Sequence, residues 1–539
     1  MKNKIHLYFA LVFMLVSGIK LKGQKYFVSF ADKNNNTYSL ESPSEFLSQR
    51  AIARRVKQDI AFIPQDLPVS QAYADSVKRM GIAVLWASKW LNGVIVESSK
   101  HTLMDTLVKV SFVKDVQLIW KETARKAVAK FNKVEEGIGN LKSSAEYGVA
   151  WMQSKTVNGH YLHQNNYEGQ NKVIAVLDNG FNSANTLSSF AHLWQDERIL
   201  SVRDVVNPGA DVFASGEHGT QVFSIMGGLL DSQLKGSAPK AAYHLIRTED
   251  NGSECPIEEY NWVVGAEYAD SIGADIINSS LGYNYFDGDF LSYSNAAMDG
   301  KTTVVTRGAQ IAFSKGMFVV CSAGNEGAKS WEKITAPADA NNVLAVAAMD
   351  ADSIRAPFSS YGPSADYRVK PDIAAMGKGT ALQNTSGNLA LGDGTSFSAP
   401  VISGFVACLW QAFPQLKNTE LLHVMRQCAH NYSNPDYAFG YGIPDFKKAL
   451  DVSNSIERYQ NSNFITYPNP FGASFTISSS ADRRVNKISM YDMAGHIVYQ
   501  QKISDLPVQV KGLHDLPKGL YLLKIELQKS TRTFKIVKN

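Results

Sequence analysis

Three segments place polar side chains where the pattern of apolar residues predicts the protein interior. Asp178 follows the apolar run 173–177, so its carboxylate is expected at the carboxyl end of a buried strand. His218 precedes an apolar stretch and is expected near the start of a helix. Ser396 lies in Gly-Thr-Ser-Phe-Ser-Ala-Pro, which opens a long apolar segment that ends before Pro414. The dipole of a helix that begins there would favour negative charge near Ser396.

An Asp, a His and a Ser in this chain order are the groups that nucleophilic acyl transfer requires. A serine hydroxyl is unreactive until a base removes its proton; an imidazole can do so, and a carboxylate holds that imidazole in the required tautomer. Asn325, which follows the apolar run 317–321, adds a side-chain amide for the oxyanion of a tetrahedral intermediate. Each segment alone is typical of a turn or a helix cap. Together they predict a hydrolytic site.

The elements that must position these residues follow from the alternation of strands and helices between residues 172 and 450. The apolar runs 173–177, 274–277, 317–321 and 343–348 are typical of buried strands, and longer amphipathic segments lie between them. This alternation predicts an α/β domain with a parallel sheet and helices on both faces. In such sheets, sites form at the carboxyl ends of the strands.

The motifs together resemble those of the subtilisin-like serine peptidases over about residues 145–452. The motifs that carry this resemblance are Asp178-Asn179-Gly180, His218-Gly219-Thr220, Ser279-Ser280-Leu281-Gly282, Ala323-Gly324-Asn325 and the run from Gly394 to Pro400. The resemblance implies that Asp178 orients the imidazole, His218 is the general base and acid, Ser396 is the nucleophile and Asn325 is the oxyanion donor. It also implies that Ser279, Ser280, Leu281 and Gly282 form a strand edge that pairs with the backbone of a protein or peptide substrate.

Three positions depart from the pattern of this family. Asn179 stands where Ser or Thr usually follows the catalytic Asp, Gln221 stands where a second His is usual, and Phe397 follows the nucleophile where Met is frequent. None of these changes removes a proton-transfer group, so they bear on rate and specificity. No metal or cofactor is expected in the catalytic set. Relatives often hold structural calcium on loop carboxylates, but no compact motif locates such a site in this sequence.

The flanking regions predict a precursor with four parts. Residues 1–23 have a basic start and a short apolar core, which is typical of a secretory signal peptide. Residues 24–145 are expected to form a small α+β unit, with a strand at 25–30, a helix at 43–57 and a polar linker from about 121, and they resemble the propeptides of such enzymes, which act as folding helpers and inhibitors. The peptidase domain is expected at 146–455.

Residues 456–539 show short strands with turn signals about every ten residues, which predicts a small all-β sandwich. The segment from Tyr467-Pro468-Asn469-Pro470 to the C-terminus resembles the type IX secretion sorting domain. We therefore expect passage through the periplasm to the cell surface or the medium by the type IX machinery. No segment after the signal peptide is long and apolar enough to span a membrane.

Charge is distributed unevenly along the chain. The formal net charge is +4, but residues 24–150 carry +5, residues 151–455 carry −11 and residues 456–539 carry +6. An acidic middle argues against nucleic-acid binding, which usually needs a basic face. The opposite signs of the first two regions permit electrostatic attraction between them.

Two rival functions stay open at this point. The chain could be a surface-binding protein that has kept the fold without activity, although the complete set of Asp, His, Asn and Ser counts against this. It could also be an acyl transferase or ligase on the same scaffold. Cys408 and Cys428 lie on consecutive helical segments and could pair in an oxidising compartment, whereas Cys321 is expected as a free thiol of the core.

Overall fold

The computed structural model describes residues 23–122, 134–137, 143–288, 290, 292–461, 464–479, 485–527 and 531–539. Nearly all of the expected signal peptide therefore lies outside the described residues. The chain divides into two compact units, with the division between Lys447 and Lys448.

The first unit is built on a parallel sheet of seven strands, as the alternation of the sequence predicts. The strand order is β14-β13-β12-β11-β6-β10-β7, and every neighbouring pair is parallel. The strands are β6 (Val173–Asp178), β7 (Ile199–Asp204), β10 (Ala242–Arg247), β11 (Ile276–Ser279), β12 (Phe318–Ser322), β13 (Leu344–Met349) and β14 (Ile373–Met376). All residues of β6, β12 and β13 are buried, because helices cover the sheet on both sides.

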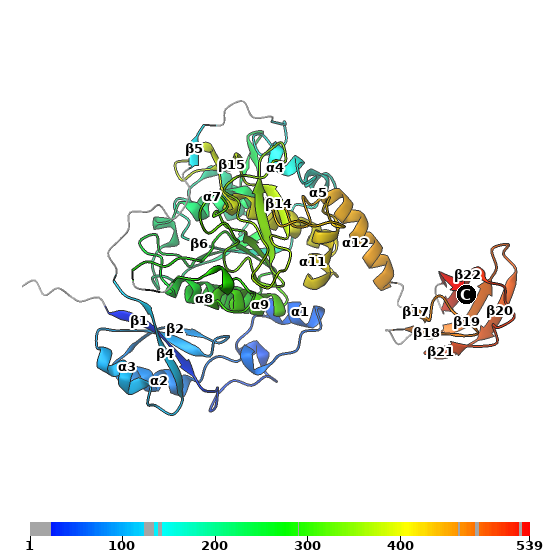
Figure 1. Ribbon diagram of the computed structural model, residues 1–539, viewed down its shortest axis with the longest axis horizontal. Helices are drawn as coiled ribbons and strands as arrows, with labels where there is room; N and C mark the ends of the chain where they lie inside the picture. Colours follow the sequence, from blue (N-terminus) through cyan, green and yellow to red (C-terminus); the bar gives the residue numbers. More distant parts are fainter. Residues whose placement is uncertain are drawn as a thin grey trace, which may run out of the picture. The chain divides into compact units, whose positions relative to one another are not determined.

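Helices lie on both faces of this sheet (Figure 1). On one face lie α7 (His218–Gly227) and α10 (Thr395–Ala412), and on the other lie α8 (Ile257–Ile272) and α9 (Val304–Ser314). The remaining helices of this part are α4 (Trp151–Lys155), α5 (His160–Gln164), α6 (Ala191–Gln195), α11 (Asn418–Gln427) and α12 (Phe446–Asn461), the last of which runs across the division between the units.

A smaller antiparallel sheet accompanies the large one. It has the order β15-β16-β5, with β15 at Thr380–Gln383, β16 at Leu389–Gly392 and β5 at Val134–Glu136. The short strands β8 (Leu229–Leu230) and β9 (Leu234–Lys235) form a separate hairpin. The stretch expected as a linker thus contributes one strand, β5.

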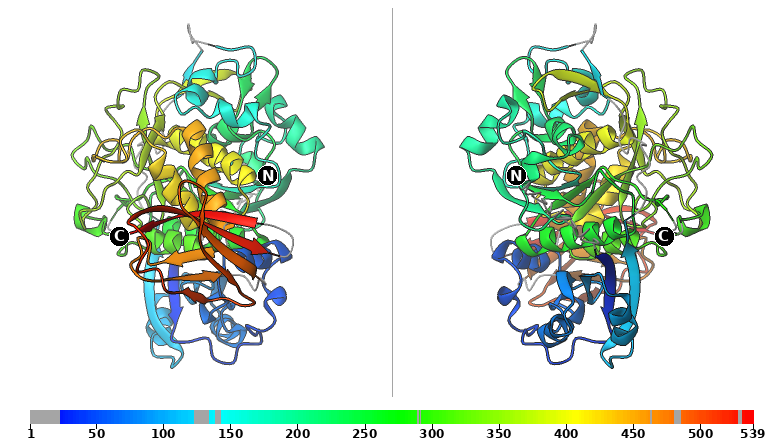
Figure 2. Two further views of the ribbon diagram at one scale, coloured as in Figure 1. Left: turned by 90° about the vertical axis from the view of Figure 1, so that its right-hand side faces the viewer. Right: turned by 90° about the vertical axis from the view of Figure 1, so that its left-hand side faces the viewer.

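Residues 24–120 form the expected small α+β part. Its four-stranded sheet has the order β2-β3-β1-β4, and helices α2 and α3 cover the face that points away from the seven-stranded sheet (Figures 1 and 2). The elements are β1 (Gln24–Phe30), α1 (Gln49–Lys57), α2 (Gln71–Arg79), β2 (Ala83–Ser88), β3 (Gly93–Ser98), α3 (His101–Leu107) and β4 (Val113–Trp120). The alternation along β1 explains both contacts of the sheet: Tyr26, Val28 and Phe30 enter the core beneath the helices, whereas Phe27 packs on Tyr260 of α8.

The helix expected from Pro43 begins later, at Gln49. Ser48 has extended backbone angles and its side chain accepts a hydrogen bond from the Ala51 N–H, so it is the N-cap. The Ser48 N–H also donates to the Ser271 carbonyl of α8, 2.8 Å away. Pro43 instead opens a separate 3₁₀ turn.

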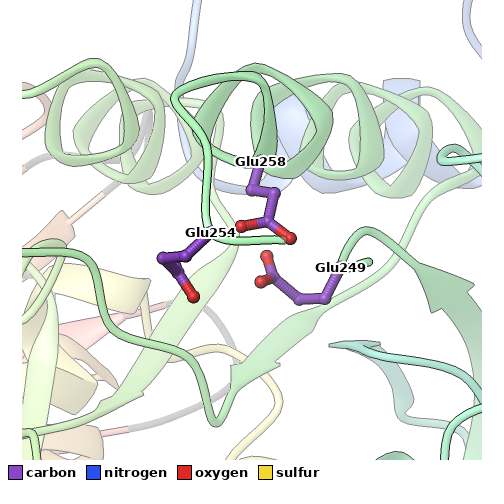
Figure 3. A group of neighbouring side chains, drawn as sticks. All are labelled: Glu249, Glu254 and Glu258. Atoms are coloured by element: carbon purple, nitrogen blue, oxygen red, sulfur yellow. The ribbon is translucent and has the colours of Figure 1, made fainter. Parts of the chain in front are cut away.

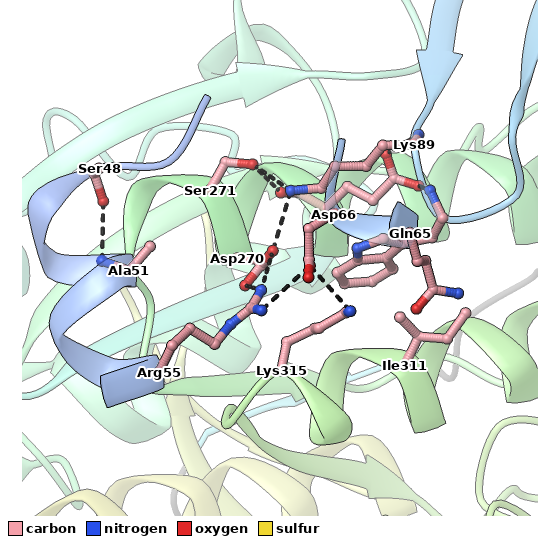
Figure 4. A network of polar contacts seen from close by, with 12 residues as sticks. Ser48, Ala51, Arg55, Gln65, Asp66, Lys89, Asp270, Ser271, Ile311 and Lys315 are labelled. Atoms are coloured by element: carbon pink, nitrogen blue, oxygen red, sulfur yellow. Dashed lines mark hydrogen bonds and ion pairs between the residues drawn. The ribbon is translucent and has the colours of Figure 1, made fainter. Parts of the chain in front are cut away.

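Buried ion pairs join α1 and its neighbouring loops to helices α8 and α9 (Figure 4). The Arg55 guanidinium contacts both carboxylate oxygens of Asp270, at 2.8 and 3.0 Å, and one oxygen of Asp66 at 3.2 Å. Asp66 also forms an ion pair with Lys315 at 2.9 Å, and Asp270 forms one with Lys89 at 3.1 Å. The opposite charges of the first and middle regions therefore meet in direct contacts.

In the second unit, the strands from Phe464 onward form the expected all-β fold. Its two antiparallel sheets have the orders β17-β18-β21 and β20-β19-β22-β23. Their strands are β17 (Phe464–Tyr467), β18 (Phe475–Ser479), β19 (Val485–Tyr491), β20 (Ile497–Lys502), β21 (Val508–Val510), β22 (Gly519–Leu527) and β23 (Thr531–Lys538). One hydrophobic core takes side chains from both sheets, for example Ile477 from the first and Leu523 from the second.

All four cysteines are buried and none forms a disulfide, so the pairing of Cys408 with Cys428 is not formed. Each of these two thiols instead contacts a nearby backbone carbonyl, that of Ser237 for Cys408 and that of Met425 for Cys428. Among the described helices, none combines the length and the apolar composition that crossing a bilayer requires.

Candidate active site

The last residue of β6 and the first residue of α7 form a buried pair. Asp178 is fully buried and His218 is 4% exposed, and the His218 Nδ1 lies 2.7 Å from Asp178 Oδ1. A carboxylate at this distance accepts the Nδ1 proton, so the other ring nitrogen, Nε2, carries the lone pair that can act as a base. The structure thus brings together two of the residues that the sequence singled out.

Close packing of α7 on the end of β6 sets the geometry of this pair. A Cβ at Gly219 would lie 2.1 Å from the Gly180 carbonyl oxygen, so only glycine allows the helix to approach the strand. Asn179 holds the same junction: its N–H donates to Asp178 Oδ1 at 2.8 Å, and its Oδ1 accepts from the Gly219 N–H at 3.1 Å. The departure at Asn179 therefore supplies a side chain that fixes the start of α7.

Ser396 lies in the first turn of α10, as expected, and is 8% exposed. Its hydroxyl donates to the Ser280 carbonyl, 3.2 Å away. Pro400 lacks the N–H that would bond the Ser396 carbonyl within the helix. The Ser280 hydroxyl takes the place of that donor, at 2.8 Å. Ser280 and Ser396 thus each donate a hydroxyl hydrogen bond to the other's carbonyl oxygen, which joins the segment after β11 to the first turn of α10.

Asn325 follows β12 and has a fixed amide orientation. Its Oδ1 accepts from the N–H and from the hydroxyl of Thr395, both at 2.9 Å. Because the oxygen is used in this way, the Nδ2 group is the part of the amide available to a ligand. Gly324 N–H also donates to the Thr395 hydroxyl, at 3.2 Å, which ties the loop to the start of α10.

A cleft of about 140 Å³ joins these groups. His218, Asn325 and Ser396 line it, together with Ser280, Leu281 and Gly282. Two of the expected residues do not line it. Asp178 lies behind His218, and the Ser279 hydroxyl accepts a hydrogen bond from Trp262 Nε1, 2.8 Å away, on the buried side of β11. The cleft lies at the carboxyl ends of β12, β11 and β6, which are neighbours in the sheet.

The other two departures from the family pattern lie in buried positions, and one of them lines the cleft. The ring of Phe397 is centred 5.7 Å from that of His218 and lines the cleft. Gln221 is 7% exposed on the first turn of α7, and its backbone carbonyl accepts from the Ser224 hydroxyl at 2.7 Å.

Three glutamates near the cleft were not singled out from the sequence. Glu249, Glu254 and Glu258 come from the loop after β10 and the first turn of α8, and their carboxylate oxygens lie within 4.8 Å of one another (Figure 3). Glu249 accepts a hydrogen bond from the buried Tyr283 hydroxyl. Burial and the charge of Glu249 raise the pKa of Tyr283 well above its usual value, so it remains a donor. Oxygen ligands of this kind suit Ca²⁺, but their irregular spacing gives no sequence motif.

Comparison with known families agrees with this geometry. Residues 169–442, half of the chain, match the model of the subtilase family. Residues 25–134 match the peptidase S8 propeptide domain of Bacteroidota, and residues 466–539 match the secretion system C-terminal sorting domain. The chain therefore carries a propeptide before its peptidase domain and a sorting domain, which implies export, after it.

Several curated proteins are similar to the peptidase part. Subtilisin E of Bacillus subtilis (strain 168) is 27% identical over 312 residues, which cover 57% of this chain and 71% of that protein. Subtilisin of Bacillus pumilus is 26% identical over 312 residues, covering 57% and 98%. The crystal structure of MycP1 from Mycobacterium smegmatis aligns with a TM-score of 0.46 and 19% identity, covering 60% of this chain and 89% of that one. The match to the family model over half of its length shows that the chain belongs to the subtilase family of serine endopeptidases.

Proposed function

We propose that this endopeptidase cleaves proteins and peptides through an acyl-enzyme formed on Ser396, with His218 as general base and acid and Asp178 as its orienting carboxylate. The observation that carries this assignment is the buried 2.7 Å contact between His218 Nδ1 and Asp178 Oδ1 in the cleft that Ser396 lines. That contact directs the basic Nε2 away from Asp178 and leaves it for the serine proton.

The reaction proceeds in two stages. The Ser396 hydroxyl turns from the Ser280 carbonyl to His218, loses its proton and attacks the peptide carbonyl, while Asn325 Nδ2 and the Ser396 N–H donate to the oxyanion. His218 then protonates the leaving amine, and water releases the acyl group by the same route. The backbone of Ser280, Leu281 and Gly282 pairs with the substrate along the cleft wall.

We further propose that the small α+β part at residues 24–120 inhibits the enzyme until it is removed. The buried contacts of Arg55 with Asp270 and of Asp66 with Lys315 support this, since they bind the propeptide to α8 and to the end of α9. The sorting domain would then direct the precursor through the periplasm to the type IX machinery.

The test compares wild-type enzyme with Ser396→Ala and with the matched control Ser398→Ala. Ser398 lies on the same helix, but its hydroxyl donates to the Thr395 carbonyl and it does not line the cleft. Casein hydrolysis and covalent labelling by a fluorophosphonate should be lost in Ser396→Ala and retained in the control. A Ser396→Ala enzyme that is folded and as active as wild type would refute the assignment. Product analysis with an added amine separates hydrolysis from acyl transfer.

A further inference from the structure

The strand β5 belongs to the catalytic part of the molecule, although it lies within the expected propeptide region. Val134, Glu135 and Glu136 pair in antiparallel register with Gly392, Leu391 and Ala390 of β16. The propeptide sheet ends at Trp120, the last residue of β4, and the match to the propeptide family ends at residue 134. No strand of the propeptide sheet pairs with β5 among the described residues.

The sheet that β5 completes connects the two helices that carry the base and the nucleophile. On one side, the Gln383 N–H of β15 donates to the Ser224 hydroxyl of α7, the helix that begins with His218, at 2.9 Å. On the other side, β16 ends at Gly392, and α10 begins three residues later at Thr395. The turn between them is held by the Gly394 N–H, which donates to the Gly377 carbonyl at 2.7 Å.

Backbone directions show that β16 depends on β5 for its outer hydrogen bonds. The N–H and carbonyl of Ala381 in β15 are both taken by the Gln153 side chain, at 2.9 and 3.2 Å. In an antiparallel pair, opposite residues alternate between bonded and non-bonded pairs, so Leu391, which lies opposite Ala381, turns its polar backbone groups away from β15. Those groups face Glu135 of β5.

We propose that β5 stays with the mature enzyme as a positioning strand, so that the mature chain begins at or before Val134. This inference rests on the proposed roles of His218 and Ser396. Without β5, β15 and β16 would be a two-stranded hairpin with an open edge, and such hairpins are marginally stable in water. With it, β16 has partners on both sides and sets the position of the turn that leads to Ser396. The start of the mature chain is then earlier than the boundary at residue 145 that the sequence indicated.

The first test is the N-terminus of the self-processed wild-type enzyme, determined by intact mass and N-terminal sequencing after activity has appeared. We expect the chain to begin at residue 134 or earlier. A mature, active enzyme that begins at residue 138 or later has lost β5 and would overturn the proposal. This measurement needs no variant, so it holds even where a substitution impairs folding.

The second test breaks the ladder between the strands. Glu135→Pro removes the backbone N–H that faces Leu391, and Glu135→Ala is the matched control because it changes the side chain alone. With active sites counted by a burst titrant, we expect kcat per site to fall at least about tenfold in the proline variant, with KM within roughly twofold, because a small displacement of Ser396 slows acylation. A purely structural role for β5 would lower the number of active sites and leave kcat per site unchanged.

The two proposals fail in different ways. Activity that persists in Ser396→Ala would refute the proposed function. Activity that depends on Ser396, from an enzyme that begins after residue 137 or has the same kcat per site in the proline and alanine variants, would refute the role of β5 alone.

Discussion

The buried guanidinium of Arg55 should control how long the cleaved propeptide stays on the enzyme. Arg55 is fully buried and makes three charged contacts, two to Asp270 and one to Asp66. Arg55→Met retains most of the side-chain volume and removes the charge. Loss of one partner from a buried ion pair costs about 3–5 kcal/mol. The two aspartates keep Lys89, Arg54 and Lys315 as partners, so we take the lower end of this range.

A loss of about 3 kcal/mol weakens binding roughly 150-fold, because each 1.4 kcal/mol is a factor of ten. The assay dilutes freshly processed enzyme and follows the lag before full peptidase activity, which reports dissociation of the propeptide. The lag should shorten by about two orders of magnitude in Arg55→Met. Arg79→Met is the control, since Arg79 is an exposed residue of α2 remote from the contact with α8. Equal lags for wild type and Arg55→Met, with complete processing in both, would refute the reasoning.

Three further predictions concern the peptidase part. Asn325→Ala should lower kcat roughly 10²–10³-fold with little change in KM, because the amide acts on the oxyanion; steady-state kinetics on one peptide substrate check this, and an unchanged kcat would exclude the role. Burial lowers the pKa of His163 from 6.5 to about 4, so the folded state binds fewer protons than the unfolded state between these values. The contribution of neutral His163 to the free energy of unfolding should therefore be fully present above pH 6.5 and fall by up to roughly 3 kcal/mol as the pH drops to 4. Thermal unfolding of Ser396→Ala across this range measures the fall, and adding His163→Gln should make the unfolding free energy less dependent on pH. Glu249→Gln with Glu254→Gln should lower kcat/KM for peptides with Lys or Arg near the cleaved bond and leave neutral peptides unaffected, because both carboxylates line the cleft; equal losses on both kinds of peptide would contradict this.

The sequence predicted the parts of the fold that depend on local pattern. The run Val173–Leu177 became β6, the segment from Gly394 became α10, and Asp178 at the end of β6 contacts His218, which lines the same cleft as Ser396. Apolar periodicity can be predicted because it is a property of one short segment. The position of Asp178 can be predicted because the carboxyl ends of parallel strands lie at one edge of the sheet.

The parts that the sequence did not predict depend on contacts between distant segments. The three glutamates of Figure 3 come together only because a loop folds back onto the first turn of α8. β5 is a strand because β16, more than 250 residues later, offers an edge, and its own three residues carry no such signal. The helix α1 begins at Gln49 and not at residue 43, because Ser48 caps it and the Ser48 N–H also donates to the Ser271 carbonyl of α8.

Because every cysteine is buried in the folded protein, the fate of an exported chain depends on how fast it folds relative to how fast its thiols are oxidised. Once folded, the four thiols are out of reach of oxidants, and burial raises the pKa of Cys255 and of Cys321 to about 12, which keeps both protonated and unreactive. While the chain is unfolded in an oxidising compartment, the same thiols are exposed and can form disulfides that the core cannot contain. Folding must therefore be faster than thiol oxidation. A slow-folding variant should accumulate as disulfide-linked species, and a reductant should restore the yield of folded protein.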